Sequence, residues 1–349
     1  MHHETSIVVT SIAAPNGVLK SIAAGCLEHG ARFYVIGDVP SPLDFSLDGC
    51  DFYSLERQTK TGLRFAELCP KRHYARKNIG YLLAIRDGSE MIVETDDDNY
   101  PLPAFWRGRS RSQRAPVIEA PGWVNVYAYF TDENIWPRGL PLDAVLSNVP
   151  PLAEQRLHDV DSPIQQGLAD DNPDVDAIYR LVLPLPLKFR QHIVVALGSG
   201  VWCPFNSQNT TWWPDAYPLL YLPAYCSFRM TDIWRSFVAQ RIAWENGWHV
   251  LFESPTVWQE RNDHNLMRDF KDEIPGYLHN RAICEKLGAL SLRRGVDALP
   301  DNLRLCYEAL VKDSFVDKAE LDLVDAWLDD LRQLQARTVQ CEDLPLARS

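Results

Sequence analysis

The sequence contains no CxxC pair, although eight cysteines are spread over its 349 residues. Structural zinc sites and redox motifs commonly use such pairs, so the scatter favours free thiols in a reducing cytoplasm over a disulfide framework or a zinc site. No apolar run approaches the roughly 18–20 residues needed to span a bilayer, and no signal-peptide pattern opens the chain. We therefore expect a cytoplasmic protein without a membrane span.

Basic residues are scarce relative to acidic ones. The chain has 35 Lys and Arg against 47 Asp and Glu, a formal net charge of −12, which argues against general binding to nucleic acid or to anionic membranes. Neither GxGxxG nor GxxxxGK[ST] follows the first predicted strand, so neither a dinucleotide-binding fold nor a P-loop is supported. A hydrophobic content of 46% nevertheless predicts a folded chain with a large core.

The sequence does contain an alternation of strand-like and helix-like segments. Apolar or β-branched runs predict strands at Ser6–Thr10, Arg32–Ile36, Asp51–Ser54 and Met91–Val93, with helices between them. Because β-α-β crossovers are right-handed, this order predicts a parallel sheet with its ligand crevice at the carboxyl ends of the strands.

Three polar residues stand at the ends of the first two strands. Thr10 and Ser11 close the first strand and Asp38 closes the second, and we assign all three to binding of a nucleotide donor. An Asp at the end of a second parallel strand can accept hydrogen bonds from a ribose or a base edge. The alternative for Asp38 is an ordinary turn residue.

An acidic triplet, Asp96, Asp97 and Asp98, follows the fourth strand. Adjacent carboxylates repel one another unless a cation lies between them. Mg²⁺ and Mn²⁺ take oxygen ligands, often one or two carboxylates with substrate phosphates completing the shell. We therefore predict a Mn²⁺ or Mg²⁺ site with Asp96 and Asp98 as ligands, and we assign Asp96 and Asp97 to donor binding. The alternative is a solvated turn.

A basic helix start precedes this triplet. Apolar residues at helical spacing predict an amphipathic helix that ends at Gly88. Arg76, Lys77 and Asn78 lie in its first turn, where free backbone N–H groups and the helix dipole favour an anion. We predict that these three residues hold a diphosphate, and the alternative is plain surface charge.

Charged residues also mark two later motifs. Trp136–Leu142 is a loop stiffened by Pro and Gly that carries one cation, Arg138, which either clamps a donor phosphate or pairs with an acid at the core edge. Asp174 and Asp176 straddle one residue, so in extended chain both point to the same side. We assign them to the catalytic centre, with capping of the following helix as the alternative.

Tryptophans and amides gather between Trp202 and Trp213, after a predicted strand at Ile193–Leu197. Aromatic faces with amide and hydroxyl groups are the usual lining of a sugar site. We assign Asn206, Asn209 and Trp212 to an acceptor site, although tryptophans are also ordinary core fillers.

Several blocks carry a family resemblance. A parallel sheet that ends a strand in DxD, without glycine loops, is the layout of GT-A nucleotide-sugar transferases. The blocks are Tyr-Ala-Arg-Lys-Asn-Ile-Gly-Tyr-Leu-Leu-Ala-Ile with the acidic strand end, Trp-Pro-Arg-Gly-Leu-Pro-Leu, Pro-Phe-Asn-Ser-Gln-Asn-Thr and Thr-Asp-Ile-Trp-Arg. In these blocks, spread over roughly residues 5–265, the chain resembles the STELLO-type glycosyltransferases and, more distantly, the reversibly glycosylated polypeptides, which are sugar mutases.

The resemblance implies a metal-dependent transfer of sugar from a nucleotide-sugar, with a UDP-sugar favoured, to a glycan or polysaccharide. It implies that Asp232, near the start of a predicted helix at Met230–Gly247, faces the acceptor as general base, with Arg235 beside it. As an N-cap, Asp232 needs no further role. The same fold also serves nucleotide-sugar mutases and nucleotidyltransferases, and a catalytically silent scaffold is the alternative of another class.

The resemblance leaves the metal ligands partly open. The STELLO motif is nearer Asp-Ala-Asp-Asp, so either Glu94 or Asp98 is expected to join Asp96 on the metal. A late histidine is a frequent third ligand in GT-A enzymes; His249 and His264 are the nearest candidates, and we assign His264.

Beyond Pro275 the sequence changes to Leu-, Ala-, Arg- and Asp-rich segments that predict helices. We therefore expect an α/β, GT-A-like domain over residues 1–275, with a mostly parallel, Rossmann-like sheet flanked by helices. A helical appendage and tail are expected over residues 276–349. The appendage is expected to pack against a partner or a second copy of the chain.

Overall fold

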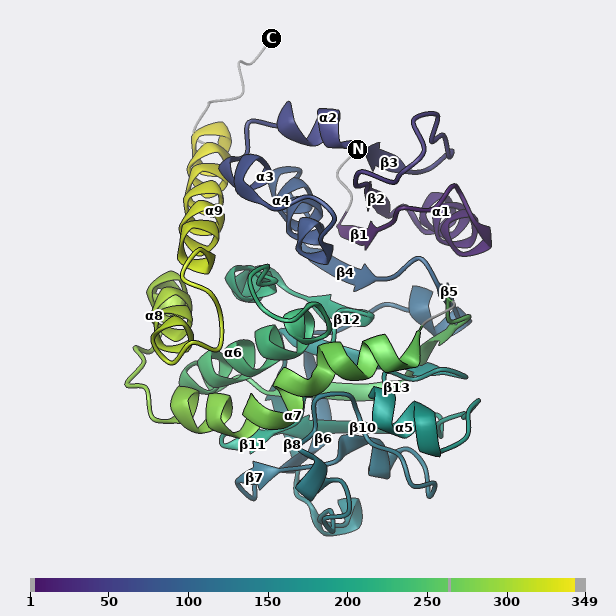
Figure 1. Ribbon diagram of the computed structural model, residues 1–349, viewed down its shortest axis with the longest axis vertical. Helices are drawn as coiled ribbons and strands as arrows, with labels where there is room; N and C mark the ends of the chain where they lie inside the picture. The colour runs from purple at the N-terminus through teal and green to yellow at the C-terminus, as the bar shows by residue number, and fades with distance from the viewer. Residues whose placement is uncertain (1–3, 263–264, 343–349) are drawn as a thin grey trace.

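A continuous β-branched segment forms the first strand, β1 (Thr5–Thr10), in the computed structural model, which describes residues 4–262 and 265–342, with side chains as far as residue 336 (Figure 1). Its alternate side chains are buried on both faces of the sheet. Ile7 and Val9 pack with α1 (Gly17–His29), whereas Val8 packs in the core that contains α4 (Lys77–Arg86). Burial on both faces explains why this strand is apolar at consecutive positions.

The strands form one large sheet in the order β3-β2-β1-β4-β12-β9-β13-β10-β6-β8, with β5 paired to β13. The first four strands are parallel, as predicted, and the other half of the sheet is mixed. The remaining strands are β2 (Arg32–Ile36), β3 (Asp51–Tyr53), β4 (Met91–Thr95), β5 (Asn99–Pro101), β6 (Ser112–Ile118), β8 (Leu157–Asp161), β9 (Ile164–Asp170), β10 (Val194–Leu197), β12 (Asn209–Trp212) and β13 (Val250–Gln259), and a separate small pair is formed by β7 (Gly122–Trp123) and β11 (Val201–Trp202). The predicted α/β, GT-A-like fold class is confirmed.

The helices cover both faces of the sheet and one end of the molecule. The α-helices not yet given are α2 (Leu55–Thr59), α3 (Arg64–Leu68), α5 (Ala177–Val182), α6 (Thr231–Glu245), α7 (Leu266–Gly288), α8 (Leu299–Lys312) and α9 (Glu320–Glu342). Short 3₁₀ helices are η1 (Tyr74–Arg76), η2 (Pro103–Trp106), η3 (Val126–Tyr129), η4 (Leu142–Ala144), η5 (Leu152–Glu154), η6 (Pro214–Leu220), η7 (Phe228–Met230) and η8 (Val296–Ala298). No α-helix lies between β2 and β3, where the sequence alternation predicted one. In the described part of the chain, no helix is long and apolar enough to cross a bilayer.

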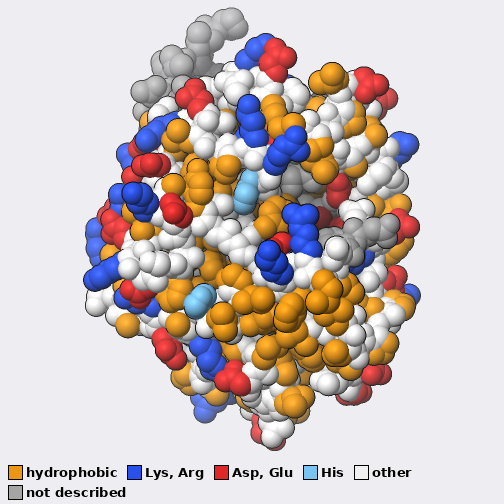
Figure 2. Space-filling model, viewed as in Figure 1, with side chains coloured by type: hydrophobic (Ala, Val, Ile, Leu, Met, Phe, Trp, Pro, Cys, Tyr) orange, Lys and Arg blue, Asp and Glu red, His pale blue; other side chains and the backbone are white. Residues whose placement is uncertain are grey.

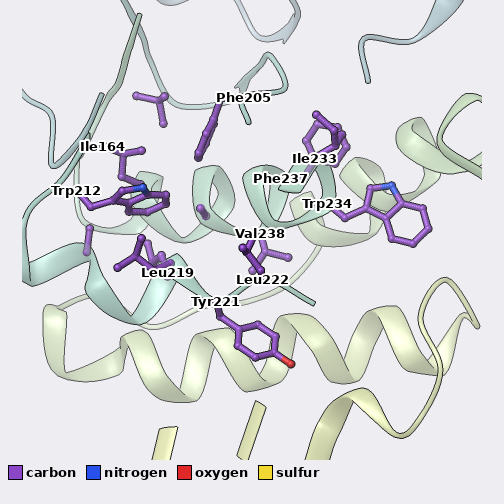
Figure 3. Close-up of a cluster of buried hydrophobic side chains, with 14 of the residues drawn as sticks. Ile164, Phe205, Trp212, Leu219, Tyr221, Leu222, Ile233, Trp234, Phe237 and Val238 are labelled. Carbon is purple, nitrogen blue, oxygen red and sulfur yellow. The ribbon is translucent and has the colours of Figure 1, made fainter. Parts of the chain in front are cut away.

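Two predicted amphipathic elements are buried on all sides. In α4, every residue from Lys77 to Ala84 is buried. The helix approaches the sheet so closely that a Cβ on Gly80 would lie 2.5 Å from a Val8 methyl group. In α6, residues 231–243 are all buried, and Figure 3 shows Ile233, Trp234, Phe237 and Val238 pointing into apolar surroundings. Both helices therefore belong to the core, including their polar side chains.

The segment predicted as a sugar-binding loop contains a central strand instead. β12 lies antiparallel between β4 and β9, with Trp212 opposite Ile92 and Ile164. Trp212 is fully buried beside Ile164 (Figure 3). Its ring is a core filler, which was the alternative to the acceptor assignment.

The C-terminal helices share one core with the sheet. The predicted boundary at residue 275 falls inside α7, which is continuous from Leu266 to Gly288. Trp327 of α9 packs edge-on against Phe65 of α3, and Asp330 accepts hydrogen bonds from the backbone N–H groups of Arg64 (2.9 Å) and Phe65 (2.8 Å). Because α9 satisfies free N–H groups at the start of α3, it stabilises that helix directly.

A matched pair of leucines tests whether α9 is integral to the fold. Leu323 of α9 is 1% exposed, and Leu278 of α7 is 68% exposed. Leu323→Ala should lower the free energy of unfolding by about 2–5 kcal/mol, whereas Leu278→Ala should change it by less than about 0.5 kcal/mol. Urea unfolding measures both values. Equal, small losses would show that the C-terminal helices do not share the core.

Candidate functional site

The acidic strand end faces a small pocket. Asp96 follows β4, and its Oδ1 accepts hydrogen bonds from Lys77 Nζ (2.8 Å) and from the Tyr74 hydroxyl (2.7 Å). Lys77 Nζ also donates to the backbone carbonyl of Ser207 (3.0 Å). The cation that relieves the crowded carboxylates in this structure is therefore Lys77, which comes from the predicted basic helix start.

This central pocket has a volume of about 80 Å³. It is lined by Asp96, Arg138, Asp174, Arg180, Gln208, Arg229, Asp232, Gln259 and Arg261. Four of these residues (Asp96, Arg138, Asp174 and Asp232) were assigned to the site from the sequence. The fold thus brings together the acidic strand end, the Trp-Pro-Arg-Gly loop, the turn after β9 and the start of α6.

Arg76 and Asn78 face the protein framework. Arg76 Nε donates to Gln58 Oε1 (2.8 Å) and its Nη1 donates to the Cys69 carbonyl (2.9 Å). Asn78 makes two hydrogen bonds with the backbone of Leu222. Of the three residues assigned to the diphosphate, Lys77 alone has contacts at the acidic strand end.

Glu94, directly before the acidic end, lies in the core. Its carboxylate accepts hydrogen bonds from the Tyr81 hydroxyl, from Trp212 Nε1 (2.8 Å) and from Arg235 Nη1 (2.9 Å). The Glu94 and Arg235 side chains are 0% and 1% exposed. Arg235 and Trp212 therefore hold Glu94 inside the protein and have no surface for an acceptor, because the helix and strand that carry them are buried on all sides. Because the carboxylate of Glu94 is already engaged in this way, Asp98 is the better candidate of the two to join Asp96 as a metal ligand.

Asp98 is buried and Asp97 is half-buried. Asp97 Oδ2 accepts a 2.5 Å hydrogen bond from Ser11 Oγ, which ties the acidic turn to the end of β1. Asp98 Oδ2 accepts from Gln259 Nε2 (3.0 Å), while its Oδ1 is buried with no hydrogen-bond partner among the described residues. Burial, and then the nearby Asp96 carboxylate, raise the pKa of Asp98 to about 7.

Arg138 lies between two carboxylates. Its Nε and Nη2 donate to Asp174 Oδ1 (2.8 Å) and Oδ2 (2.9 Å), and its Nη1 and Nη2 donate to Asp232 Oδ1 (3.1 Å) and Oδ2 (2.9 Å). Gly139 permits this position, because its φ is +91° and a Cβ there would lie 2.5 Å from Ile233. Burial acts to raise the pKa of Asp232, but the Arg138 guanidinium outweighs it and holds that pKa below its usual value.

Helix capping was the alternative role for Asp176 and for Asp232, and the structure shows it for Asp176 and not for Asp232. Asp176 is the N-cap of α5: its Oδ1 accepts from Tyr179 N (2.8 Å), and its Oδ2 accepts from Trp136 Nε1 (2.7 Å). Burial raises the pKa of Asp176 to about 6. Asp232 is not a cap, because α6 begins after Met230 without a side-chain cap. The capping role therefore belongs to Asp176, and Asp232 is left facing the pocket.

The remaining predicted residues divide between pocket edge and framework. Asn206 Nδ2 donates to Asp174 Oδ2 (2.9 Å), so it adjoins the Arg138 cluster. Asn209 bonds to Thr256 Oγ1 (2.7 Å) and is buried. Asp38 ends β2 as predicted and accepts from His73 N (2.9 Å), and the Thr10 hydroxyl is buried without a partner in the described chain.

Sequence reasoning missed three of the four arginines that line the central pocket: Arg180 from α5, Arg229 from η7 and Arg261 from the segment after β13. They come from three separate parts of the chain, and none belongs to a recognisable motif. Of the three, Arg229 had a signal in the sequence, because it lies three residues before Asp232.

A metal ion fits the oxygen atoms at the strand end. Among the described residues no group of three or more His, Cys, Asp or Glu side chains is arranged to hold a metal. Mg²⁺ or Mn²⁺ bound with a diphosphate needs only one or two carboxylates. Asp96 and the unpartnered Oδ1 of Asp98 supply hard oxygen ligands of that kind. His264 lies outside the described residues, and His249 precedes β13, at the end opposite Gln259.

A larger cavity of about 690 Å³ lies elsewhere, between the β5–β6 connection and the start of β10. Arg109, Asp170 and Glu253 are among its lining residues. It contains none of the residues that the sequence assigned to the site, and the acidic strand end does not reach it. Size alone therefore does not make it the reaction site.

Comparison with known proteins shows that the chain is similar to one family of glycosyltransferases. The family model of the STELLO glycosyltransferases matches residues 229–341. The probable glycosyltransferase STELLO1 of Arabidopsis thaliana is 29% identical over 351 residues, which cover 94% of this chain and 44% of the relative. The probable glycosyltransferase STELLO2 of the same plant is 27% identical over 368 residues, which cover 99% and 47%. The resemblance to the STELLO-type glycosyltransferases is confirmed.

This chain spans less than half the length of the two STELLO relatives. The matched family region runs from Arg229 through α6 to α9. It therefore includes Asp232 and Arg261 as well as the helices predicted to be an appendage. The C-terminal helices are part of what this chain shares with the STELLO family.

The core position of Arg235 can be tested by stability. Arg235→Met should lower the free energy of unfolding by about 3–5 kcal/mol, because it leaves the buried Glu94 carboxylate without its cation. The double variant Glu94→Gln/Arg235→Met should recover part of that loss. Chemical denaturation measures both. If Arg235→Met is as stable as the parent, the core role of Arg235 is wrong and its assignment to the acceptor site stands again.

Proposed function

We propose that the chain is a metal-dependent glycosyltransferase that moves a sugar from a nucleotide-sugar, with a UDP-sugar favoured, to a glycan acceptor. One observation carries the proposal: Asp96 at the end of β4 and Asp232 at the start of α6 line the same pocket. In this proposal Asp96 serves the donor and Asp232 serves the acceptor within that pocket. The STELLO match supports the reaction class, since both relatives are named as probable glycosyltransferases.

On the donor side, Asp96 and Asp98 would hold Mn²⁺ or Mg²⁺, and Lys77 fixes the orientation of Asp96. When bound, the metal would neutralise charge on the diphosphate leaving group. Ser11 and Asp97 join the end of β1 to this turn, and Thr10 and Asp38 stand at the ends of neighbouring strands. In this proposal those residues face the nucleoside.

On the acceptor side, Asp232 accepts the proton of the incoming hydroxyl group as its oxygen bonds to the anomeric carbon. The bond from that carbon to the diphosphate breaks, and the electron pair leaves with the nucleoside diphosphate. Arg138 keeps Asp232 ionised and therefore able to take a proton. Asp174 and Asn206 form the adjoining polar wall for acceptor hydroxyls. A role in polysaccharide synthesis, a cytoplasmic location and a partner on the C-terminal helices stay predictions.

The reaction is tested by incubating the chain with UDP-sugars and glycan acceptors, with Mn²⁺ or with EDTA. Transfer that stops in EDTA and resumes with Mn²⁺ is the expected result. Interconversion of free nucleotide-sugars without transfer would indicate a mutase. No binding of any nucleotide-sugar would indicate an interaction scaffold.

Asp96→Asn tests the donor side. This variant should weaken Mn²⁺-dependent donor binding by at least about tenfold, because it removes an anionic oxygen from the proposed metal site. The fold should survive, since an amide oxygen can still accept from Lys77. Asp159→Asn, on the exposed face of the β8 edge strand, is the matched control and should leave binding unchanged. Equal calorimetric affinities for the two variants would make the acidic strand end a solvated turn.

Asp232→Asn tests the acceptor side. Loss of a general base should reduce turnover by about 10²–10⁴-fold, with donor affinity nearly unchanged. Asp174→Asn removes the other carboxylate partner of Arg138 and serves as the control for lost pairing. Turnover and thermal stability are measured for both. If Asp174→Asn loses more turnover than Asp232→Asn, the base is Asp174 and the assignment of Asp232 is wrong.

A further inference from the structure

Three arginines, Arg180, Arg229 and Arg261, line the central pocket together with its carboxylates. Arg180 and Arg261 also line a neighbouring side pocket of about 290 Å³. The side pocket is completed by Asn172, Leu183, Leu185, Asn262 and Leu266. Arg180 and Arg261 thus line both hollows, and Figure 2 shows Lys and Arg side chains near the centre of the face that it presents.

Two of the three arginines have acidic partners outside the pocket. Arg229 Nη2 pairs with Glu273 Oε1 (2.9 Å), and Arg261 Nη2 pairs with Asp269 Oδ2 (2.9 Å). Both acids come from α7 and do not line the central pocket, so they bind these guanidinium groups from outside it. This arrangement fixes the position of the two cations at the pocket wall.

Arg180 has no carboxylate within ion-pair distance in the described part of the chain. Its Nη2 donates to the Pro173 carbonyl (2.9 Å), its Nη1 makes a long contact with Asn172 Oδ1 (3.4 Å), and its Nε is buried with no partner among the described residues. Burial, and then repulsion from Arg261 and Arg229, lowers the pKa of Arg180 to about 9, against the weaker opposing attraction of Asp174 and Glu273. A desolvated cation beside two others destabilises the empty site unless an anion balances it.

The acids of the pocket do not balance this charge, because they already have cations of their own. Arg138 pairs with both Asp174 and Asp232, and Lys77 pairs with Asp96. The pocket thus has a carboxylate side with matched cations and an arginine side with a surplus positive charge. An anion that bridges several guanidinium groups fits the arginine side, and phosphate oxygens match the planar arginine fork.

We propose that Arg180, with Arg229 and Arg261, forms a phosphate-binding site that holds the diphosphate of the donor without requiring a metal. The identity of the ligand rests on the proposed function, whereas the site itself rests on the unbalanced Arg180. The metal ligands and the three arginines then contact the same diphosphate. The basic helix start at residues 76–78 is not needed for this task.

The test uses calorimetry on the full chain in EDTA, with inorganic pyrophosphate, UDP and uridine as separate ligands. Pyrophosphate and UDP should bind, and Arg180→Gln should weaken both by about 10- to 100-fold, the range for a hydrogen bond to a charged group. Arg268→Gln is the control, because Arg268 lies in the first turn of the neighbouring helix α7 but its side chain is 81% exposed. It should change affinity less than about twofold. Uridine, which lacks phosphate, should bind Arg180→Gln and the parent equally.

Stability gives a second measurement. Arg180→Gln removes a partly buried cation that has no ion-pair partner among the described residues, so its melting temperature in phosphate-free buffer should equal or exceed that of the parent. Parent protein that binds neither pyrophosphate nor UDP in EDTA, or unchanged affinity in Arg180→Gln, would overturn the site. Pyrophosphate binding that depends on Arg180 without any sugar transfer would keep the phosphate site and reject the proposed function. Sugar transfer without Arg180-dependent pyrophosphate binding would keep the proposed function and reject the phosphate site.

Discussion

The position of Arg138 between Asp174 and Asp232 is the interaction on which the site depends. It joins the loop after Trp136, the turn between β9 and α5, and the start of α6. Without that guanidinium, two buried carboxylates would face each other and at least one would take up a proton. With it, Asp232 stays ionised at the pocket wall. A second pairing, Glu94 with Arg235, fixes β4 to α6 beneath the pocket and so sets the distance between donor side and acceptor side.

The first half of the fold could be predicted from sequence because its signals are local. β1, β2 and β4 are continuous apolar runs, and the glycine at position 88 ends α4 with a positive φ of 79°. The second half depends on pairing between distant segments. β12 enters the sheet between β4 and β9, and its Asn-Thr-Thr-Trp sequence carries no apolar run, so a loop was predicted. Its backbone partners, not its composition, make it a strand.

The candidate site divides in the same way. Asp96, Lys77 and Asp174 were found because acidic strand ends and helix starts have recognisable spacing, whereas Asp232 was assigned through the family resemblance. The burial of Trp212 and Arg235 could not be inferred from the sequence, because tryptophan and arginine occur both in protein cores and at sugar-binding sites. Arg180 had no signal, because its role depends on Arg229 and Arg261 arriving from later parts of the chain. The sequence indicates which groups are present, and only the fold shows which charges remain unbalanced.

The central claim is that this pocket binds a nucleotide-sugar, and a thermal-shift screen tests it most directly. Binding to the native state must raise the melting temperature, by an amount set by ligand concentration relative to Kd. The account predicts that a UDP-sugar raises the melting temperature in EDTA and raises it further with Mn²⁺, since the arginine side and the carboxylate side then both contribute. A screen in which no nucleotide-sugar shifts the melting temperature under either condition would contradict it.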